Sequence, residues 1–127
     1  MPAPVLLCID DRLELLMIRK TTFERLGCLV ITATTTSAAI AMLKRTAVAA
    51  VLLEYKGEGM DAEAVACQIK RRFPSQPVIL LSAYSDVPER VLWWVDEYVM
   101  RSDPPELVVQ LIKNMRSGTE KGQTAAS

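Results

Sequence analysis

The chain has 127 residues, a length that fits one domain built around one hydrophobic core. Half of the residues are hydrophobic, but no apolar run approaches the roughly 18 residues that a membrane span needs, and we expect no membrane association. Fifteen basic residues balance fifteen acidic ones and histidine is absent, so we expect no nucleic-acid partner, no histidine-based catalysis and no histidine-ligated metal.

Short apolar runs recur five times along the chain and predict five β-strands. Most runs are continuous rather than alternating, which is typical of strands that are covered on both faces of a sheet. The runs span residues 5–9, 28–33, 48–53, 78–81 and 98–100.

The stretches between these runs carry apolar residues at helical spacing and predict helices. The shared helix faces are Leu16, Phe23 and Leu26; Ala39, Ile40 and Leu43; Val65, Ala66, Ile69 and Phe73; and Leu107, Val108, Leu111, Ile112 and Met115. Gly27 is placed to end the first helix. Thr36 or Ser37 is placed to cap the second helix, and Asp61 the third.

A strand followed by a helix, repeated five times, predicts an α/β domain with a five-stranded parallel sheet and helices on both faces. We assign residues 1–116 to this single domain and residues 117–127 to a flexible polar tail. Cys8, Cys28 and Cys67 lie in apolar stretches without metal-type spacing. We therefore expect buried, reduced thiols and a cytoplasmic location.

Polar side chains follow the predicted strands at the points where the strands end. Asp10 and Asp11 follow the first strand, Glu54 the third, Ser82 the fourth and Arg101 the fifth. Ligands of parallel sheets bind beyond these carboxyl ends. Three carboxylates, a hydroxyl and a cation at one edge are what a phosphoryl-transfer pocket with Mg²⁺ requires.

These motifs together resemble the response regulator receiver domain, over roughly residues 4–116. The sequence at 5–11 resembles the acidic opening of that family, and the sequence at 51–61 its phosphorylation loop. Residues 80–83 resemble the hydroxyl site, and Tyr98 lies three residues before Arg101, where the family has a switch aromatic before a lysine. The resemblance implies a flavodoxin-like fold of five βα units.

The resemblance also implies a role for each matched residue. Asp10 and Asp11 would hold Mg²⁺ with Glu54 and the main-chain carbonyl of Lys56, and Glu54 would also occupy the acceptor position. Ser82 and Tyr98 would respond to the phosphoryl group, and Arg101 would stand in the position of the lysine.

The sequence also departs from the family pattern. Glu54 replaces Asp, Arg101 replaces Lys, Gly57 and Glu58 replace Met-Pro, Ala62 replaces Gly, and Ser102 stands where a proline is common. The stretch between Ser82 and Arg101 is short by about one helical turn, which predicts a shortened fourth helix.

The two substitutions in the pocket are consistent with each other. Glutamate carries its carboxylate outward by on the order of 1.5 Å, toward the place of a phosphoryl group. Arginine can hold that carboxylate through two hydrogen bonds, which lysine cannot. We expect Mg²⁺ to bind weakly at most.

Plainer interpretations stand beside these roles. Asp10 and Asp11 can cap the first helix, Ser82 can close a turn, and Tyr98 can be a half-buried strand aromatic. The adjacent Trp93 and Trp94 either fill the gap left by a short fourth helix or place one ring in solvent as an anchor for a partner.

The sequence therefore predicts a signalling module and not an enzyme. In the first hypothesis it is a receiver-like domain that acts without phosphorylation. It would bind a histidine kinase or an output protein through the fourth helix, fifth strand and fifth helix, with Trp93, Trp94 and Tyr98 on that face, and a homodimer is a second arrangement. The alternative hypothesis is a functional Mg²⁺-dependent phosphoacceptor.

Overall fold

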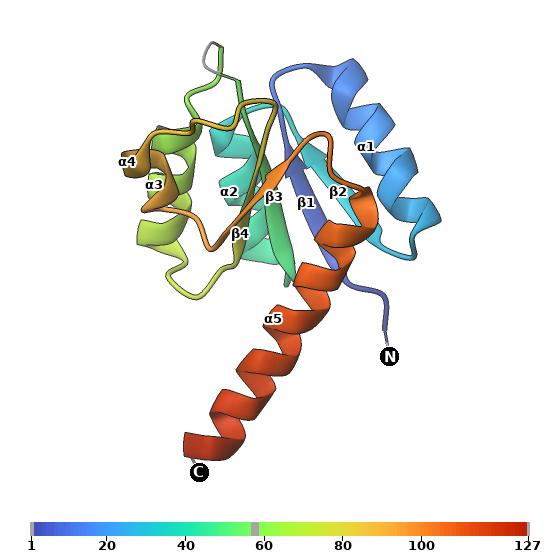
Figure 1. Cartoon of the computed structure of the whole chain (residues 1–127), viewed down its shortest axis with the longest axis vertical. Helices are drawn as coiled ribbons and strands as arrows, with labels where there is room; N and C mark the ends of the chain where they lie inside the picture. Colours follow the sequence, from blue (N-terminus) through green and yellow to red (C-terminus); the bar gives the residue numbers. More distant parts are fainter. Residues whose placement is uncertain (1, 57–58, 127) are drawn as a thin grey trace.

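The computed structural model describes residues 2–56 and 59–126, with side chains as far as residue 116. Within these residues, strands and helices alternate along the chain (Figure 1). The strands are β1 (Val5–Ile9), β2 (Leu29–Ala33), β3 (Ala50–Tyr55), β4 (Val78–Ser82) and β5 (Glu97–Met100). The helices are α1 (Leu13–Arg25), α2 (Thr36–Arg45), α3 (Ala62–Arg72), α4 (Glu89–Leu92) and α5 (Pro105–Ala126).

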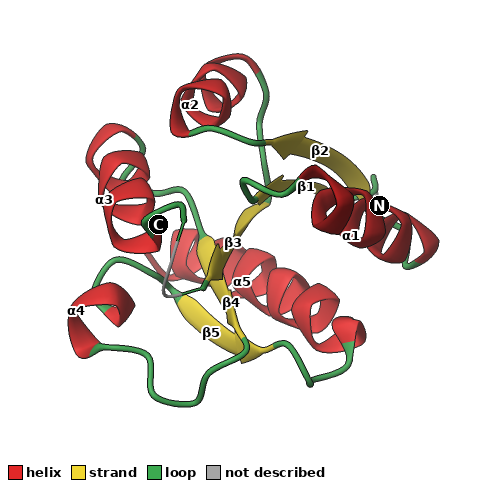
Figure 2. Ribbon diagram, turned by 90° about the horizontal axis from the view of Figure 1, so that it is seen from above, coloured by secondary structure: helices red, strands yellow, loops and turns green. Residues whose placement is uncertain are grey.

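The strands form one parallel sheet in the order β2-β1-β3-β4-β5. Figure 2 shows α1 and α5 on one face of this sheet and α2, α3 and α4 on the other. The predicted α/β class, parallel sheet and two covered faces are confirmed. All strands point the same way, so their carboxyl ends share one edge.

The core has two parts, one on each face of the sheet. In β1, Leu6 and Cys8 belong to one cluster, and Leu7 and Ile9 to the other. Successive strand residues point to opposite faces, so a strand buried on both sides needs an apolar residue at every position. This explains the continuous apolar runs.

Most predicted helix boundaries are confirmed, and one cap is corrected. Gly27 adopts a positive φ of 93° after α1, a conformation that suits glycine. The Asp61 side chain accepts a hydrogen bond from the Ala64 amide at 3.3 Å and caps α3. In α2 the cap is Thr35, which accepts from the Ala38 amide at 3.1 Å, whereas Thr36 and Ser37 lie inside the helix. Four hydroxyl residues in a row, from Thr34 to Ser37, left this choice open.

The fourth and fifth helices differ in length. The predicted shortening of α4 is confirmed, since it spans only Glu89–Leu92. The helix α5 continues through residues 117–126, the segment that the sequence analysis expects to be a flexible polar tail, and it projects beyond the sheet (Figure 1). No proline follows residue 105, so the segment has no strict helix breaker, and Gly118 and Gly122 only lower its helix propensity.

Two predictions about exposure need correction. Leu107 was placed on the inward face of α5, but it is 40% exposed because α5 buries Val108 and Ile112 instead. All three cysteines are free, but only Cys8 and Cys28 are buried, while Cys67 is half-buried. No helix in the described part of the chain is long and apolar enough to cross a membrane.

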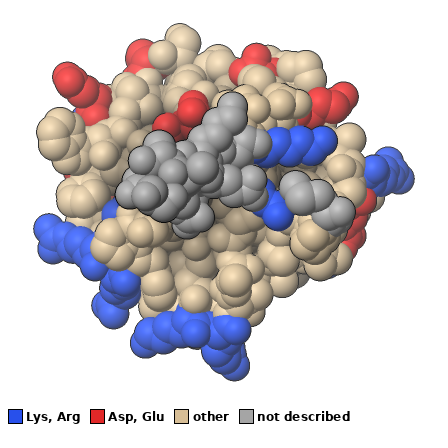
Figure 3. Space-filling view, turned by 90° about the horizontal axis from the view of Figure 1, so that it is seen from below, with Lys and Arg blue, Asp and Glu red and all other residues tan. Residues whose placement is uncertain are grey.

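The end of the molecule away from the carboxyl edge carries basic groups along much of its rim, while acidic groups lie mostly along the upper side of the view (Figure 3). The last turns of α2 and α3 contribute Lys44, Arg45, Lys70, Arg71 and Arg72. Cations at the C-terminus of a helix are favoured by the helix dipole, which accounts for their position.

Candidate functional site

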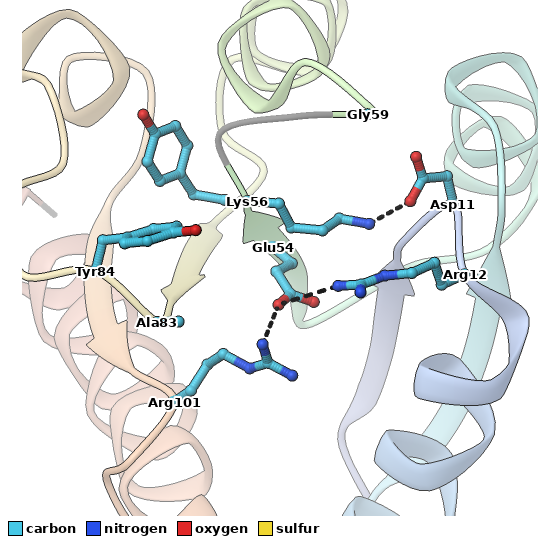
Figure 4. Close-up of a pocket in the computed structure, with 9 residues that line it drawn as sticks. Asp11, Arg12, Glu54, Lys56, Gly59, Ala83, Tyr84 and Arg101 are labelled. Atoms are coloured by element: carbon cyan, nitrogen blue, oxygen red, sulfur yellow. Dashed lines mark hydrogen bonds and ion pairs between the residues drawn. The ribbon is translucent and has the colours of Figure 1, made fainter.

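A pocket of about 310 Å³ opens at the carboxyl edge of the sheet, above the end of β3 (Figure 4). It is lined by Asp11, Arg12, Glu54, Tyr55, Lys56, Gly59, Ala83, Tyr84 and Arg101. The chain thus brings together Asp11, Glu54, Lys56 and Arg101 from three separate segments, as the strand order predicts. Asp10 lies directly beneath, buried at the end of β1. Gly57 and Glu58 of the loop lie outside the described residues.

Glu54 is the buried centre of the pocket, with 3% of its surface exposed. Its Oε1 atom lies 3.1 Å from Nη1 of Arg101 and 4.0 Å from Nη2 of Arg12. Oε1 accepts no hydrogen bond from the described groups, so the Arg101 contact is an ion pair whose angle does not suit a hydrogen bond. The expected pairing of Glu54 with Arg101 is present, but it is not the bidentate pair that the sequence suggested.

The stronger partner of Glu54 is Arg19, which the sequence analysis missed. Nη2 of Arg19 donates to Oε2 of Glu54, and Nη1 donates to Oδ2 of Asp10 at 2.9 Å. One guanidinium therefore joins the ends of β1 and β3, and only 11% of its side chain is exposed. Such charge-assisted pairs are among the strongest hydrogen bonds in proteins.

A signal for Arg19 is present in the sequence. Leu16, Phe23 and Leu26 define the inward face of α1, and residue 19 falls on that face, three positions after Leu16 and four before Phe23. A charged residue inside an apolar helix stripe needs a buried partner. The position therefore indicates an ion pair, although it does not say with which acid.

Lys56 also enters the acidic cluster, through its side chain. Its ammonium group contacts Oδ1 of Asp10 and Oδ1 of Asp11, and 9% of the side chain is exposed. The sequence analysis gave Lys56 a role only through its main-chain carbonyl. The ammonium group lies between the two acids that were expected to hold Mg²⁺.

Asp11 fixes the loop on the opposite side of the pocket. Its Oδ2 accepts a hydrogen bond from the Met60 amide at 3.0 Å. Gly59 adopts a φ of +74°, and a Cβ atom there would lie 2.7 Å from the same oxygen. Only glycine provides both this backbone conformation and the space for Asp11.

The buried charges shift one another's pKa values. Burial would raise the pKa of Asp10, but its interactions with Glu54, Lys56 and the Arg12 amide outweigh burial and hold it below its ordinary range. Burial, together with the neighbouring Asp10, raises the pKa of Glu54 despite the opposing effect of Arg19. Burial would lower the pKa values of Arg19 and Lys56, but their acidic partners raise them, so both cations stay protonated at neutral pH.

The residues as arranged do not fit a Mg²⁺ ion. Asp10 and Asp11 direct one oxygen each to the Lys56 ammonium group, and the other oxygen of each accepts from Arg19 or from Met60. Across the described ranges, no three Cys, Asp or Glu side chains are grouped so as to hold a metal ion. A hard divalent cation needs several free oxygens.

Ser82 is fully buried, and its hydroxyl group is already paired. Oγ accepts from the Tyr84 amide at 2.9 Å and donates to the Tyr84 carbonyl at 3.1 Å. These bonds close the turn after β4, which is the plainer of the two roles considered for this serine. Tyr84, which the sequence analysis did not single out, lines the pocket in its place.

Tyr98 is half-buried on β5, and its hydroxyl group donates to the Tyr84 carbonyl. The Tyr84 ring in turn meets the Tyr55 ring edge-on, with 6.2 Å between centroids. Tyr98 therefore contacts the turn that Ser82 closes. This geometry agrees with both interpretations of Tyr98. It can be an aromatic residue packed on the strand, or a switch residue that moves when the conformation of the turn changes.

The two tryptophans at the end of α4 have different surroundings. Trp93 is 79% exposed. Trp94 packs against the core cluster beneath α2, α3 and α4, and the Arg71 guanidinium lies 5.9 Å from its ring centroid. The shortened helix thus packs one ring partly against the core and leaves the other in solvent, as the second interpretation expects.

No family model matches the chain. The curated protein "Probable transcriptional regulator ycf27" of Porphyridium aerugineum is 27% identical over 122 residues, which cover 94% of this chain and 50% of that protein. The chain thus spans about half the length of this curated relative.

Several solved structures share the fold of this chain over most of its length. The response regulator TrrA of Thermotoga maritima, solved in complex with Mg(2+)-BeF, is 24% identical with a TM-score of 0.76, over 88% of this chain and 98% of that one. A CheY-like receiver domain of Methanospirillum hungatei is 21% identical with a TM-score of 0.78, over 94% and 98%. A receiver domain of Clostridium thermocellum is 20% identical with a TM-score of 0.78, over 92% and 97%. The five parallel strands, the acidic edge and these likenesses show that the chain has the fold of response regulator receiver domains.

Proposed function

We propose that this chain is a receiver-like module of two-component (phosphorelay) signal transduction that acts by protein–protein contact, without phosphorylation of Glu54. The observation that carries the proposal is the environment of Glu54. Its carboxylate is buried and lies against the guanidinium groups of Arg19, Arg101 and Arg12.

A phosphoacceptor carboxylate must approach phosphorus in line with the leaving group and be free to attack. Arg19 of α1 binds Oε2 of Glu54. Arg101 approaches Oε1 from the end of β5 (Figure 4). Both oxygens are therefore engaged in ion pairs that an attack would have to weaken. The Ser82 hydroxyl group, bonded to the Tyr84 backbone, gives no free donor to a phosphoryl group.

The partner in this proposal is a protein, either a histidine kinase or a signalling output protein. We place the contact on the α4-β5-α5 face because Trp93, which directly follows α4, is exposed, and tryptophan often supplies much of the binding energy of an interface. A homodimer through the same face is the second arrangement. The module would be a cytoplasmic signalling protein and not an enzyme, which agrees with its free cysteines.

The alternative function is a working Mg²⁺-dependent phosphoacceptor. It is favoured by the placement of Asp10 and Asp11 at the carboxyl edge beside Glu54, and by the similarity to TrrA, which was solved with Mg(2+)-BeF. The alternative requires Lys56 and Arg19 to leave the acids that they contact.

The deciding experiment is treatment with acetyl phosphate and Mg²⁺, followed by intact-mass measurement. We expect no phosphoryl adduct on the wild-type protein, because Glu54 is held by arginines. The variant Glu54→Asp/Arg101→Lys carries the usual residues at both positions and serves as the matched comparison. A stoichiometric adduct that maps to Glu54 in the wild-type protein would establish the alternative and overturn the proposal.

A further inference from the structure

We propose that Arg19 and Lys56 are resident cations that take the place of a divalent metal ion in this pocket, so that the acidic edge is neutralised from within the chain. The inference deepens the proposed function and rests on it for the identity of the pocket. It concerns how the site is regulated, because the charge of this receiver-like pocket would not change when Mg²⁺ is added.

The first observation is the position of Arg19 on α1. Its side chain rises from the inward face of the helix, between the buried Leu16 and Phe23, in a place that packing alone would assign to an apolar residue. Its two terminal nitrogens bind two different carboxylates, Asp10 and Glu54. Removing one partner from such a pair would leave an uncompensated charge in the pocket.

The second observation is the position of Lys56. Its ammonium group contacts Asp10 and Asp11 at once. A chelated metal ion would have to occupy the space between these two carboxylates and bind the same oxygens. The ammonium group and a metal ion therefore exclude each other.

The third observation is the balance of charge. Within the described residues, three carboxylates of the pocket contact four cations. Arg12 and Arg101 are half-exposed at the mouth, whereas Arg19 and Lys56 are enclosed. The cluster thus already has an excess of one positive charge, and a divalent ion would add two more at close range.

The test is calorimetric titration of Mg²⁺ into five proteins: wild type, Lys56→Met, Arg19→Met, the double variant, and Lys20→Met. Lys20 is the matched control, because it is a cation on the same helix that pairs with the exposed Glu24 and not with the pocket. We expect no saturable binding to wild type or to Lys20→Met at millimolar Mg²⁺.

Lys56→Met should gain one Mg²⁺ site, with affinity at least roughly tenfold above any binding by wild type, since two carboxylates lose their shared counter-ion. The double variant should bind more tightly still. Adding Asp10→Asn to Lys56→Met should abolish the gain, which locates the site. If Arg19→Met does not fold, Lys56→Met decides the question alone.

Saturable one-to-one binding of Mg²⁺ by wild type, as tight as by Lys56→Met, overturns the inference. Absence of binding in both also counts against it, because acids freed of Lys56 should then attract the ion. Mg²⁺ binding by wild type without a phosphoryl adduct leaves the proposed function standing. An adduct on Glu54 that forms equally well in the presence of a chelator removes the proposed function alone.

Discussion

Arg19 changes what the acidic edge of the sheet can do. Without it, Asp10 and Glu54 would be two buried carboxylates at the ends of neighbouring strands with no guanidinium shared between them. With it, they are joined by one guanidinium that is anchored in α1. The same residue therefore fixes the position of Glu54 and ties the first helix to the centre of the sheet.

We expect Arg19→Met to destabilise the fold by about 3 kcal/mol at neutral pH, since removing one partner of a buried ion pair leaves uncompensated charge. Lys20→Met is the control on the same helix and should cost less than about 1 kcal/mol, as is typical of exposed pairs. Urea unfolding of both variants measures the difference. Equal stability of the two variants would show that the Arg19 contacts contribute nothing net.

The loop between β3 and α3 controls the outer wall of the pocket. Gly59 allows the Met60 amide to reach Asp11, and Asp11 in turn contacts Lys56. A single backbone conformation is thus linked to the position of the ammonium group in the acidic cluster. Gly27 and Gly59 both have a positive φ, but only Gly59 lies close to Asp11. Comparing the same substitution at both positions therefore separates the cost of the backbone conformation from the cost of the Asp11 contact.

Gly27→Ala should cost about 1 kcal/mol, because its φ of 93° strains alanine while nothing lies within 4 Å of the new Cβ atom. Gly59→Ala should cost more, about 2 kcal/mol, because its Cβ atom would also meet Asp11 at 2.7 Å. Thermal unfolding of the two variants gives the comparison. If both lose the same stability, Asp11 moves away without cost and does not hold the loop.

The charge network also determines how the whole fold responds to acid. The pKa of Asp10 is held below its ordinary value, so its contribution to stability is fully present above about pH 3.9, the usual aspartate pKa. That contribution is lost as the pH falls below this value toward the folded-state pKa. Glu54, whose pKa is raised, responds in the opposite direction and takes up its proton first.

We therefore expect the wild-type protein to lose stability steeply below about pH 4, and Asp10→Asn to lose less over the same range because it has no such proton to bind. Denaturant unfolding at a series of pH values measures both curves. The difference between the two curves of unfolding free energy against pH reports on Asp10, because Glu54 is present in both proteins. Parallel curves would show that Asp10 is not the group that titrates.

The fold could be predicted from the sequence to a large extent. Continuous apolar runs and helical faces follow directly from burial on both sides of a sheet, so the class, the parallel strands and the short α4 were correct. The strand ends also placed Asp10, Glu54 and Arg101 at one edge. The boundaries were less certain, as Thr35 and the length of α5 show, because neighbouring residues of similar propensity compete for them.

The sequence by itself thus determined which strand-end residues gather at the carboxyl edge, because strand direction alone brings them there. Only the tertiary structure decided how they pair. Arg19 is far from Glu54 in the chain, and its reach depends on how α1 packs against β1 and β3. Likewise, whether the Lys56 side chain turns toward Asp10 and Asp11 or toward solvent depends on the loop that closes beside it. The periodicity of a helix or strand fixes the face on which a side chain lies. Ion pairing depends on the distances between different elements, and these are set only when the elements pack together.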